Sequence, residues 1–446
     1  MAATTRYHDN MKYIVKAPAQ LNVEISLPPS KSIYNRVLLM QRMIGQSLPI
    51  QPPHIADDTE VLFKALQSDA DEVNIHGSGT AMRFLTAYYA ASPNEAHMLT
   101  GTARMYARPI GQLVNALRSL GADIEYLDHE GFPPLCVRGR QLRGGETSMP
   151  GNVSSQFISA LLMVAPLFDE GLTLHIEGPI ISRSYIDLTL ALMNDYGAQA
   201  GWSSVDTIRV EPRYGTQTPP SLLAPISDED FNTTRRMWIE SDWSAASYWY
   251  EIIALYNNPD ARLTLYGLND GSRQGDATVR HLFSLVGIKS RFMPPVETHL
   301  TPLQMHCTPT HMQQLNFHFI NQPDLAPTFV VMCCLKGMHF QFTGLDSLRY
   351  KESNRLEALL TEMRKIGFVI EEDDNGTLKW DGQRCEGMEQ PVINTYEDHR
   401  MAMSFAPAAI TLGSIIIDSP EVVDKSYPQY WTDLEKAGFT ITPINA

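Results

Sequence analysis

The chain has 446 residues, of which 43% are hydrophobic, and its 35 basic and 50 acidic residues give a net charge of −15. At roughly 100–200 residues per domain this length predicts two or three domains, and no run approaches the ~20 apolar residues of a membrane span. The negative charge argues against nucleic acid or an anionic membrane as a partner. The cysteines lack metal-ligand spacing and the N-terminus lacks an apolar signal region, so we expect buried free thiols and a cytoplasmic protein.

The first predicted elements are a strand, with apolar residues at alternate positions over 21–27, and a helix that follows two prolines. The helix begins within "SKSIYNR", which places Lys31, Ser32 and Arg36 at its first turns. N–H groups at a helix start are unpaired and electropositive, so hydroxyls and cations there form a seat for an anion. A second interpretation needs no ligand: Ser30 or Ser32 caps the helix and both cations are solvated.

An apolar helix that ends in glycine and is followed by a strand recurs along the chain. We expect a left-handed backbone, as at helix C-termini, at Gly121, Gly197, Gly287, Gly367 and Gly438. Their spacing exceeds the ~20–50 residues of stacked repeats, so each unit is interpreted as a small α/β subdomain. A sixth unit, over 31–76, has no closing glycine and is predicted to be shortened.

Two places in the sequence indicate domain boundaries, the proline pair at 28–29 and the stretch around 241–244. We expect one domain over 30–241 and a second formed by 1–29 plus 242–446, with hinges near 28–31 and 240–244. Three subdomains then fall in each domain, and the two domains are expected to close on each other as a clamp.

Further cations and hydroxyls precede helices in the first half. "GSGTAMR" provides Gly77 and Gly79, which are free to take positive φ and to present N–H groups to an anion. Arg108 stands before a helix-opening proline. The group Ser154–Gln156 begins an apolar helix and holds more polar side chains than one cap requires.

The second half repeats this arrangement. Lys351 and Arg355 are four residues apart and would share a helix face, and Arg400 and Lys425 precede helices. Asp324 enters an apolar run, where a carboxylate is costly unless it is paired. Each of these sites, taken alone, is explained without a ligand, either as a helix cap or as a solvated charged face. Together the sites predict one positive cleft that binds two anionic metabolites.

Nine motifs occur in one order along the chain: SKSIYNR, GSGTAMR, RPIG, VSSQFISALL, SYIDLTL, RQGD, KESNRL, DHRMAM and DKSYP. Together they resemble the family of 5-enolpyruvylshikimate-3-phosphate (EPSP) synthases, over about 21–439. The resemblance implies an α/β (α+β) enolpyruvyl-transferase fold of two domains, each built from three similar subdomains. It implies transfer of the enolpyruvyl group of phosphoenolpyruvate to the 5-hydroxyl of shikimate 3-phosphate through a tetrahedral intermediate, with release of phosphate, on the route to chorismate and aromatic amino acids. It also implies a monomer without metal or organic cofactor, whose partners are the two substrates.

The resemblance assigns the site residues position by position. Contacts to shikimate 3-phosphate fall on Lys31, Ser32, Arg36, Ser154, Ser155, Gln156, Ser182, Asp324, Ser347 and Lys351. Contacts to phosphoenolpyruvate fall on Lys31, Gly79, Arg108, Gln156, Arg355, Arg400 and Lys425. The catalytic residues are then Asp324, Glu352, Lys31 and Lys425. Asp324 matches the family's base for the 5-hydroxyl, and Glu352 matches the residue that moves a proton at the methylene carbon.

Three positions depart from the family pattern. Gly77 and Ser347 stand where asparagine is common, and Phe84 stands where proline is common, which leaves the shape of the glycine turn and sensitivity to glyphosate open. Two alternatives also fit. One is the related transferase that acts on UDP-N-acetylglucosamine and shares the fold; the other is a homologue that binds ligands without turnover. The Ser154–Gln156 group favours shikimate 3-phosphate over UDP-N-acetylglucosamine as the acceptor substrate.

Overall fold

The computed structural model describes residues 11–46, 48, 55–215, 239–294, 301–373 and 375–445. The chain divides into two compact units. The first unit consists of residues 1–28, 241–272 and 276–446, and the second consists of residues 29–240 and 273–275. The chain therefore leaves the first unit at 28, returns at 241, and makes a short excursion to the second unit at 273–275.

The described residues form five four-stranded sheets, and three of these belong to the first unit. The strand orders are β18-β19-β1-β20, β12-β13-β11-β2 and β14-β15-β17-β16. The strands are β1 (Met11–Lys16), β2 (Asn22–Ser26), β11 (Arg262–Tyr266), β12 (Ile288–Phe292), β13 (Leu303–Cys307), β14 (Gln314–His318), β15 (His339–Thr343), β16 (Glu371–Glu372), β17 (Leu378–Trp380), β18 (Val392–Ile393), β19 (Ser414–Asp418) and β20 (Thr440–Asn445). The α-helices are α8 (Trp243–Tyr256), α9 (Val279–Leu285), α10 (Ala326–Leu335), α11 (Arg355–Lys365), α12 (His399–Phe405), α13 (Ala409–Leu412) and α14 (Tyr430–Lys436).

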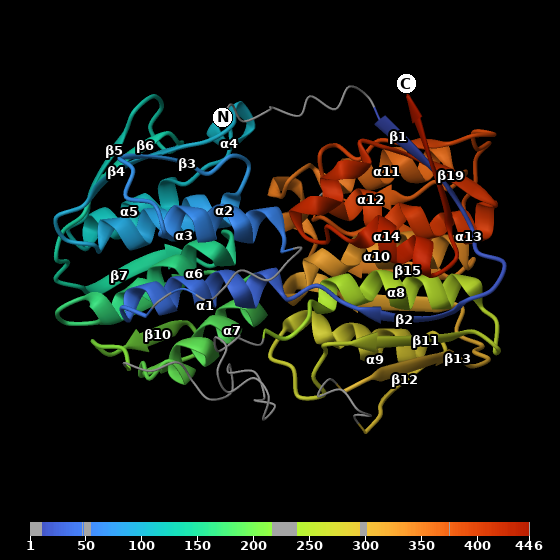
Figure 1. Cartoon of the computed structure of the whole chain (residues 1–446), viewed down its shortest axis with the longest axis horizontal. Coiled ribbons are helices and arrows are strands. Elements are labelled where there is room, and N and C mark those ends of the chain that lie inside the picture. Colours follow the sequence, from blue (N-terminus) through green and yellow to red (C-terminus); the bar gives the residue numbers. More distant parts are fainter. Residues whose placement is uncertain are drawn as a thin grey trace, which may run out of the picture. The chain divides into compact units, whose positions relative to one another are not determined.

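The second unit contains the other two sheets, with strand orders β3-β4-β6-β5 and β7-β8-β10-β9. The strands are β3 (Glu72–Asn74), β4 (Ala96–Thr100), β5 (Asp123–Tyr126), β6 (Leu135–Arg138), β7 (Gly145–Pro150), β8 (Leu172–Glu177), β9 (Ala200–Trp202) and β10 (Thr207–Val210). The α-helices are α1 (Lys31–Met43), α2 (Asp57–Leu66), α3 (Gly79–Ala90), α4 (Ala103–Tyr106), α5 (Gly111–Ser119), α6 (Ser155–Val164) and α7 (Arg183–Asp195). In Figure 1, α2, α3 and α5 lie between the strands β3 to β6 above them and β7 below them.

All five sheets share one topology. Two neighbouring strands run parallel, as β7 and β8 do, and two further strands extend the sheet antiparallel, as β10 and β9 do. Parallel neighbours need a crossover, and a helix supplies it, for example α6 between β7 and β8. In one sheet the N-terminal strand β1 takes the third place, between β19 and β20. The predicted repetition of small α/β subdomains is confirmed.

The first repeat of the second unit is shortened, as the sequence indicates. Within 31–76, the described residues form α1, α2 and one short strand, β3, and β3 pairs with β4 in the sheet of the next repeat, so this unit has no sheet of its own. The expectation that no strand lies between α2 and the glycine turn is wrong for β3. Five glycines close their helices with φ between 84° and 99°, as predicted, and they are Gly121, Gly197, Gly287, Gly367 and Gly438. Each lies one residue beyond a helix C-cap, where a left-handed backbone lets the chain turn away.

A separate apolar core fills each unit. The core of the first unit includes Trp249, Phe329 and Tyr430, and that of the second includes Leu38, Phe84 and Ile158. Within the part of the chain that the structure describes, no helix is both long and apolar enough to cross a membrane. All five cysteines are free thiols, but only Cys333 and Cys334 are buried, so the expectation of buried thiols is correct for these two.

Three local predictions are wrong. Gly77 and Gly79 do not have positive φ; His76, just before them, does, at 49°. The helix after Arg108 begins at Gly111, so Pro109 precedes the helix instead of opening it. Lys351 ends a 3-10 turn, η6 (Asp346–Tyr350), and lies before α11, so it does not share a helix with Arg355.

Candidate functional site

The start of α1 holds one cation in an ion pair. Ser30 caps the helix, because its Oγ accepts a hydrogen bond from the backbone N–H of Ile33 at 3.5 Å. The cap interpretation is therefore right for Ser30. The interpretation of Lys31 as a solvated cation is wrong, since its Nζ donates to Asp58 Oδ2 at 3.0 Å and its side chain is only 16% exposed.

Arg36 is buried on the next turn of α1. Its guanidinium donates to Thr189 Oγ1 at 2.7 Å, to the backbone oxygen of Ser32 at 2.8 Å and to Ser159 Oγ at 3.0 Å. These acceptors are all uncharged. Burial lowers the pKa of Arg36 to about 10, so the side chain keeps its positive charge at neutral pH. The ring of Phe84, which replaces the family's proline, lies 5.6 Å from this guanidinium and supports it.

Gly79 is the first residue of α3, whose start is capped by Ser78. A Cβ atom on Gly79 would come within 2.5 Å of Arg83 Nη1 and 2.8 Å of Arg108 Nη1. Glycine here leaves room for the close approach of two guanidinium groups, which a side chain at this position would displace, and it does not serve an unusual φ. Arg83 and Arg108 thus converge on the N-terminus of α3, where the sequence predicts an anion contact.

Gln156 joins this cluster from α6. Its Oε1 accepts from Arg83 Nη1 at 2.8 Å, and its Nε2 donates to Thr80 Oγ1 at 3.1 Å. Ser154 caps α6, because its Oγ accepts from the backbone N–H of Gln156 at 3.4 Å. Ser155 is the first residue of the helix and is buried. Gly79, Arg108 and Gln156, which the resemblance assigns to one ligand, thus lie in one cluster with Arg83.

Two further residues of the second unit are Ser182, which was predicted as a site residue, and Arg83, which was not. Ser182 precedes α7, is buried, and has a left-handed backbone with φ of 54°. Arg83 was not predicted as a site residue. Its spacing was the available signal, because a residue four places after Gly79 on a helix lies on the same face.

Asp324 is the centre of a cluster of cations in the first unit. It lies on the 3-10 turn η5 (Pro323–Leu325) before α10. Its Oδ1 accepts from Arg355 Nη1 at 2.8 Å and lies 3.5 Å from Lys351 Nζ, and its Oδ2 accepts from Arg400 Nη2 at 2.9 Å. The cap interpretation of Asp324 is wrong, since its side chain does not cap α10. The predicted pairing is confirmed.

These charges decide the state of Asp324. Burial acts to raise its pKa, but the positive charges of Arg400, Lys351 and Arg355 outweigh burial and hold the pKa well below its usual value. The side chain is therefore a carboxylate at any pH near neutral, and it can accept a proton but has none to donate.

Arg355 connects this carboxylate to two others. Its Nη2 donates to Glu352 Oε2 at 2.6 Å, and its Nε donates to Asp398 Oδ2 at 2.7 Å. Burial acts to lower the pKa of Arg355, but the charges of Asp398, Glu352 and Asp324 raise it, so the guanidinium is permanently charged. The predicted residues Asp324, Glu352 and Arg355 thus form one network.

Three residues of this network were missed as site residues. Asp398 caps α12 by accepting from the backbone N–H of Arg400, and Tyr248 Oη accepts from Arg400 Nη1 at 3.4 Å. Asp276, within the motif RQGD, lies close enough to Asp324 and Arg400 for their charges to affect its pKa. The sequence gives the order of the motifs but not their positions in space. It therefore does not show that Tyr248, on α8, lies beside Arg400 at the start of α12.

The remaining predicted residues lie on short turns. Ser347 is on η6, Lys425 ends η8 (Pro420–Lys425), and both are partly exposed, so their roles stay predictions.

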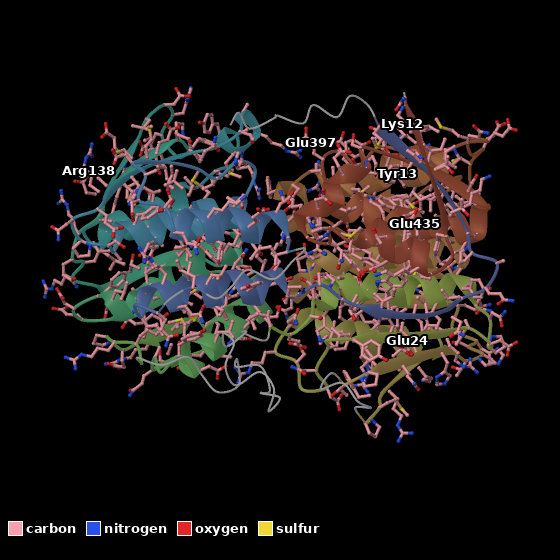
Figure 2. All side chains as sticks on the ribbon, viewed as in Figure 1. Lys12, Tyr13, Glu24, Arg138, Glu397 and Glu435 are labelled. Atoms are coloured by element: carbon pink, nitrogen blue, oxygen red, sulfur yellow. The ribbon has the colours of Figure 1, made fainter. Side chains whose placement is uncertain are left out.

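Among the residues that the structure describes, no three His, Cys, Asp or Glu side chains are grouped so as to hold a metal ion. Elsewhere an exposed cation can pair with an acid at the surface. Arg138, labelled in Figure 2, does so with Glu125 at 2.8 Å.

A family model and two relatives with similar sequences share one description. The family described as EPSP synthase (3-phosphoshikimate 1-carboxyvinyltransferase) matches residues 62–434. A 3-phosphoshikimate 1-carboxyvinyltransferase of Bacteroides fragilis (strain YCH46) is 47% identical over 431 residues, which cover 97% of this chain and 99% of that protein. A protein with the same description from Photobacterium damsela subsp. piscicida is 32% identical, over 93% of this chain and 97% of its own.

Solved structures agree in fold. An EPSP synthase from Acinetobacter baumannii superposes with a TM-score of 0.72 at 19% identity, covering 98% of this chain and 100% of that one. The enolpyruvyl transferase NikO from Streptomyces tendae gives a TM-score of 0.67 at 14% identity, covering 98% of this chain and 100% of its own. The predicted fold class is confirmed. From the family match and the relatives at 32% and 47% identity, the chain belongs to the EPSP synthase (3-phosphoshikimate 1-carboxyvinyltransferase) family.

Proposed function

We propose that this protein transfers the enolpyruvyl group of phosphoenolpyruvate to the 5-hydroxyl of shikimate 3-phosphate and releases phosphate. The observation that carries this proposal is the Asp324 carboxylate, held by Arg355, Arg400 and Lys351 beside the Glu352 carboxyl. Cations in that number suit an anionic substrate, and two carboxyl groups suit a reaction that moves two protons. The family membership of the chain supports the same activity.

The reaction has an addition and an elimination. In the addition, the 5-hydroxyl oxygen bonds to C2 of phosphoenolpyruvate, the hydroxyl loses its proton, and C3 gains a proton to become a methyl group. In the elimination, the methyl group loses a proton and the C2–O bond to phosphate breaks. Asp324 is assigned to the hydroxyl proton and Glu352 to the proton at C3, and these assignments are part of the proposal.

Substrate binding would activate Asp324. A carboxylate whose pKa is held far below neutral is a weak base, because it has little tendency to take up a proton. Arg355 and Arg400 are also the residues assigned to phosphoenolpyruvate. When its carboxylate and phosphate bind these arginines, Asp324 loses part of its stabilisation and its pKa rises. Phosphoenolpyruvate would thus create the base that its own reaction requires.

The second unit would supply the other anion contacts. Arg36 carries a buried positive charge, and Arg108 with the start of α3 forms a second positive site. In this proposal Arg36 binds shikimate 3-phosphate together with Lys31 and the serines, and Arg108 binds phosphoenolpyruvate together with Gly79 and Gln156. Exclusion of water around the bound substrates would protect the tetrahedral intermediate from hydrolysis.

A phosphate-release assay tests the proposal. The purified chain is incubated with phosphoenolpyruvate and either shikimate 3-phosphate or UDP-N-acetylglucosamine, and the product is identified by NMR. We expect the wild-type protein to release phosphate when shikimate 3-phosphate is the acceptor and not when UDP-N-acetylglucosamine is. The Asp324→Asn variant should release no phosphate with either acceptor. Release only with the sugar nucleotide would assign the alternative transferase, and binding of both ligands without release would assign a non-catalytic homologue.

Two further expectations need their own measurements. Calorimetry of shikimate 3-phosphate with and without glyphosate reports whether the altered glycine turn still accepts an inhibitor. Sedimentation of the protein tests the predicted monomer.

A further inference from the structure

The side-chain amide of Gln156 is fixed at both ends by α3. Its oxygen accepts from Arg83 Nη1 at 2.8 Å, and its nitrogen donates to Thr80 Oγ1 at 3.1 Å. A guanidinium only donates, so the atom that it touches must be the amide oxygen. The orientation of the amide therefore follows from the position of Arg83.

This orientation decides what Gln156 offers to a ligand. An amide carries an acceptor on one side and two N–H donors on the other, and rotation by 180° exchanges them. With the oxygen against Arg83, one N–H reaches Thr80 and the second is left to donate. An anion needs donors, so a rotated amide would present a repulsive oxygen to it.

Arg83 is itself held firmly. It is only 6% exposed, and its guanidinium lies 5.0 Å from the ring centroid of Phe157, the neighbour of Gln156 on α6. Its Nη1 also lies beside Gly79, where a Cβ would come within 2.5 Å. A planar group that both stacks and donates cannot be reproduced by lysine, whose charge is a compact point.

We propose that Arg83 is a positioning residue for phosphoenolpyruvate binding, which acts by orienting the Gln156 amide so that its N–H group and not its oxygen meets the anion. This inference rests on the proposed function, because it takes Gln156 as a contact of phosphoenolpyruvate. It adds a residue that does not touch the substrate in this role but decides how a contact residue does.

A double-mutant cycle tests this role. The variants are Arg83→Met, Gln156→Ala and both together, and Arg143→Met, which removes an exposed arginine of the same unit paired with Glu170, is the control. For Arg83→Met we expect the KM for phosphoenolpyruvate to rise about tenfold or more, as for loss of a buried charge-assisted hydrogen bond. Gln156 is assigned to shikimate 3-phosphate as well, but most of the contacts assigned to that substrate do not involve Gln156, so its KM should rise less than the KM for phosphoenolpyruvate.

The coupling between the two sites is the decisive readout. If Arg83 acts through Gln156, its replacement costs little once Gln156 is alanine, so the double variant resembles Gln156→Ala. Additive effects, equal rises in both KM values, or an Arg83→Met variant with wild-type kinetics would each overturn the inference. A structural role alone predicts a lower melting temperature without this coupling.

Two safeguards keep the test conclusive. If Arg83→Met does not fold, Arg83→Lys replaces it in the cycle; lysine keeps the charge but not the fork geometry, so we expect the same coupled rise. If the wild-type chain shows no turnover, the proposed function fails, and the cycle is repeated on the dissociation constant for phosphoenolpyruvate by calorimetry. An active wild type with uncoupled variants defeats only the role of Arg83.

Discussion

Arg355 and Asp398 form a bidentate ion pair that is shut off from solvent. The guanidinium donates from Nε to one carboxylate oxygen at 2.7 Å and from Nη2 to the other at 3.2 Å, and the two side chains are 1% and 0% exposed. Arg355 begins α11 and Asp398 caps α12. The pair therefore connects the starts of two helices whose residues Arg355 and Arg400 both contact Asp324.

Breaking this pair should destabilise the protein strongly. Asp398→Asn leaves the buried guanidinium without its main counter-charge, and we expect the free energy of unfolding to fall by about 3–5 kcal/mol. Asp381→Asn is the control, because Asp381 is 57% exposed and lies 3.9 Å from Lys379. A surface pair of this kind is worth about 0–1 kcal/mol. Urea denaturation of both variants measures the difference, and equal losses would contradict the argument.

Much of the architecture could be predicted from sequence periodicity. The five helix-closing glycines, the strand before Lys31 and the shortened first repeat are properties of local sequence, because chirality and hydrophobic period act within a few residues. The failures are local as well. Lys351 has the spacing of a helical neighbour of Arg355, but a 3-10 turn precedes α11 and tertiary contacts place it instead.

The composition of the site was predictable only in part. Asp324 and Arg400 are 76 residues apart, and their contact depends on how α10 and α12 pack together, which no local pattern contains. Tyr248 and Asp276 were missed for the same reason, whereas Arg83 could have been found from its spacing to Gly79. Tyr248 and Asp276 each lie in an ordinary helical or turn sequence, and their roles appear only from their partners in space.

Asp276 should give phosphoenolpyruvate binding a pH dependence near neutrality. Burial, and after it the charge of Asp324, raise its pKa to about 7 against the lowering effect of Arg400. Below that pH the side chain is neutral; above it, a negative charge forms near Arg400. We therefore expect affinity for phosphoenolpyruvate to weaken as pH rises through about 7.

Asp276→Asn should remove this dependence. Asparagine is uncharged at every pH and can still hydrogen bond to Ser244 Oγ, the partner of the Asp276 carboxyl. Calorimetric titrations from pH 6 to 8 compare the two proteins, and the difference between them cancels the ionisation of phosphoenolpyruvate itself. Parallel curves for wild type and variant would show that another group titrates.

Lys31→Met should lower both turnover and stability, because Lys31 pairs with Asp58 in a largely buried position. We expect kcat to fall about 10²–10³-fold, as for loss of one electrostatic contact in an active site. The melting temperature should fall as well, since Asp58 is left without its cation. Lys64→Met removes an exposed lysine of α2 and should change neither quantity.

A double variant separates the two effects. Lys31→Met/Asp58→Asn removes the unpaired charge, so stability should recover while turnover stays low. Recovery of turnover would show that Lys31 acts only as the partner of Asp58.

Gly79→Ala should weaken phosphoenolpyruvate binding without harming the fold. The added methyl group would displace the guanidinium groups of Arg83 and Arg108, which lie 2.5 and 2.8 Å from the Cβ position. We expect the KM for phosphoenolpyruvate to rise about tenfold or more. Alanine is favoured over glycine in a helix, so the melting temperature should hold or rise. Gly77→Ala is a matched control, because its Cβ position is open, and a similar KM rise there would contradict the steric explanation.

The buried carboxyl group of Glu251 should lower the free energy of unfolding as the pH rises. It is fully buried on α8, neither carboxyl oxygen has a hydrogen-bond partner among the described residues, and burial raises its pKa well above the usual value. At low pH the folded and unfolded chains are both protonated here. Above the unfolded pKa only the unfolded chain ionises freely, so the free energy of unfolding falls by up to about 1.4 kcal/mol per pH unit until the folded pKa is reached.

Glu251→Gln removes this penalty, because the amide has the same shape and never ionises. We expect the variant to match wild type near pH 4 and to exceed it increasingly from pH 5 to 8 in urea denaturation. Glu357→Gln, on the exposed side of α11, is the control and should track wild type at every pH. A gap between Glu251→Gln and wild type that does not widen with pH would mean that the Glu251 carboxyl is not kept neutral by its surroundings in the folded state.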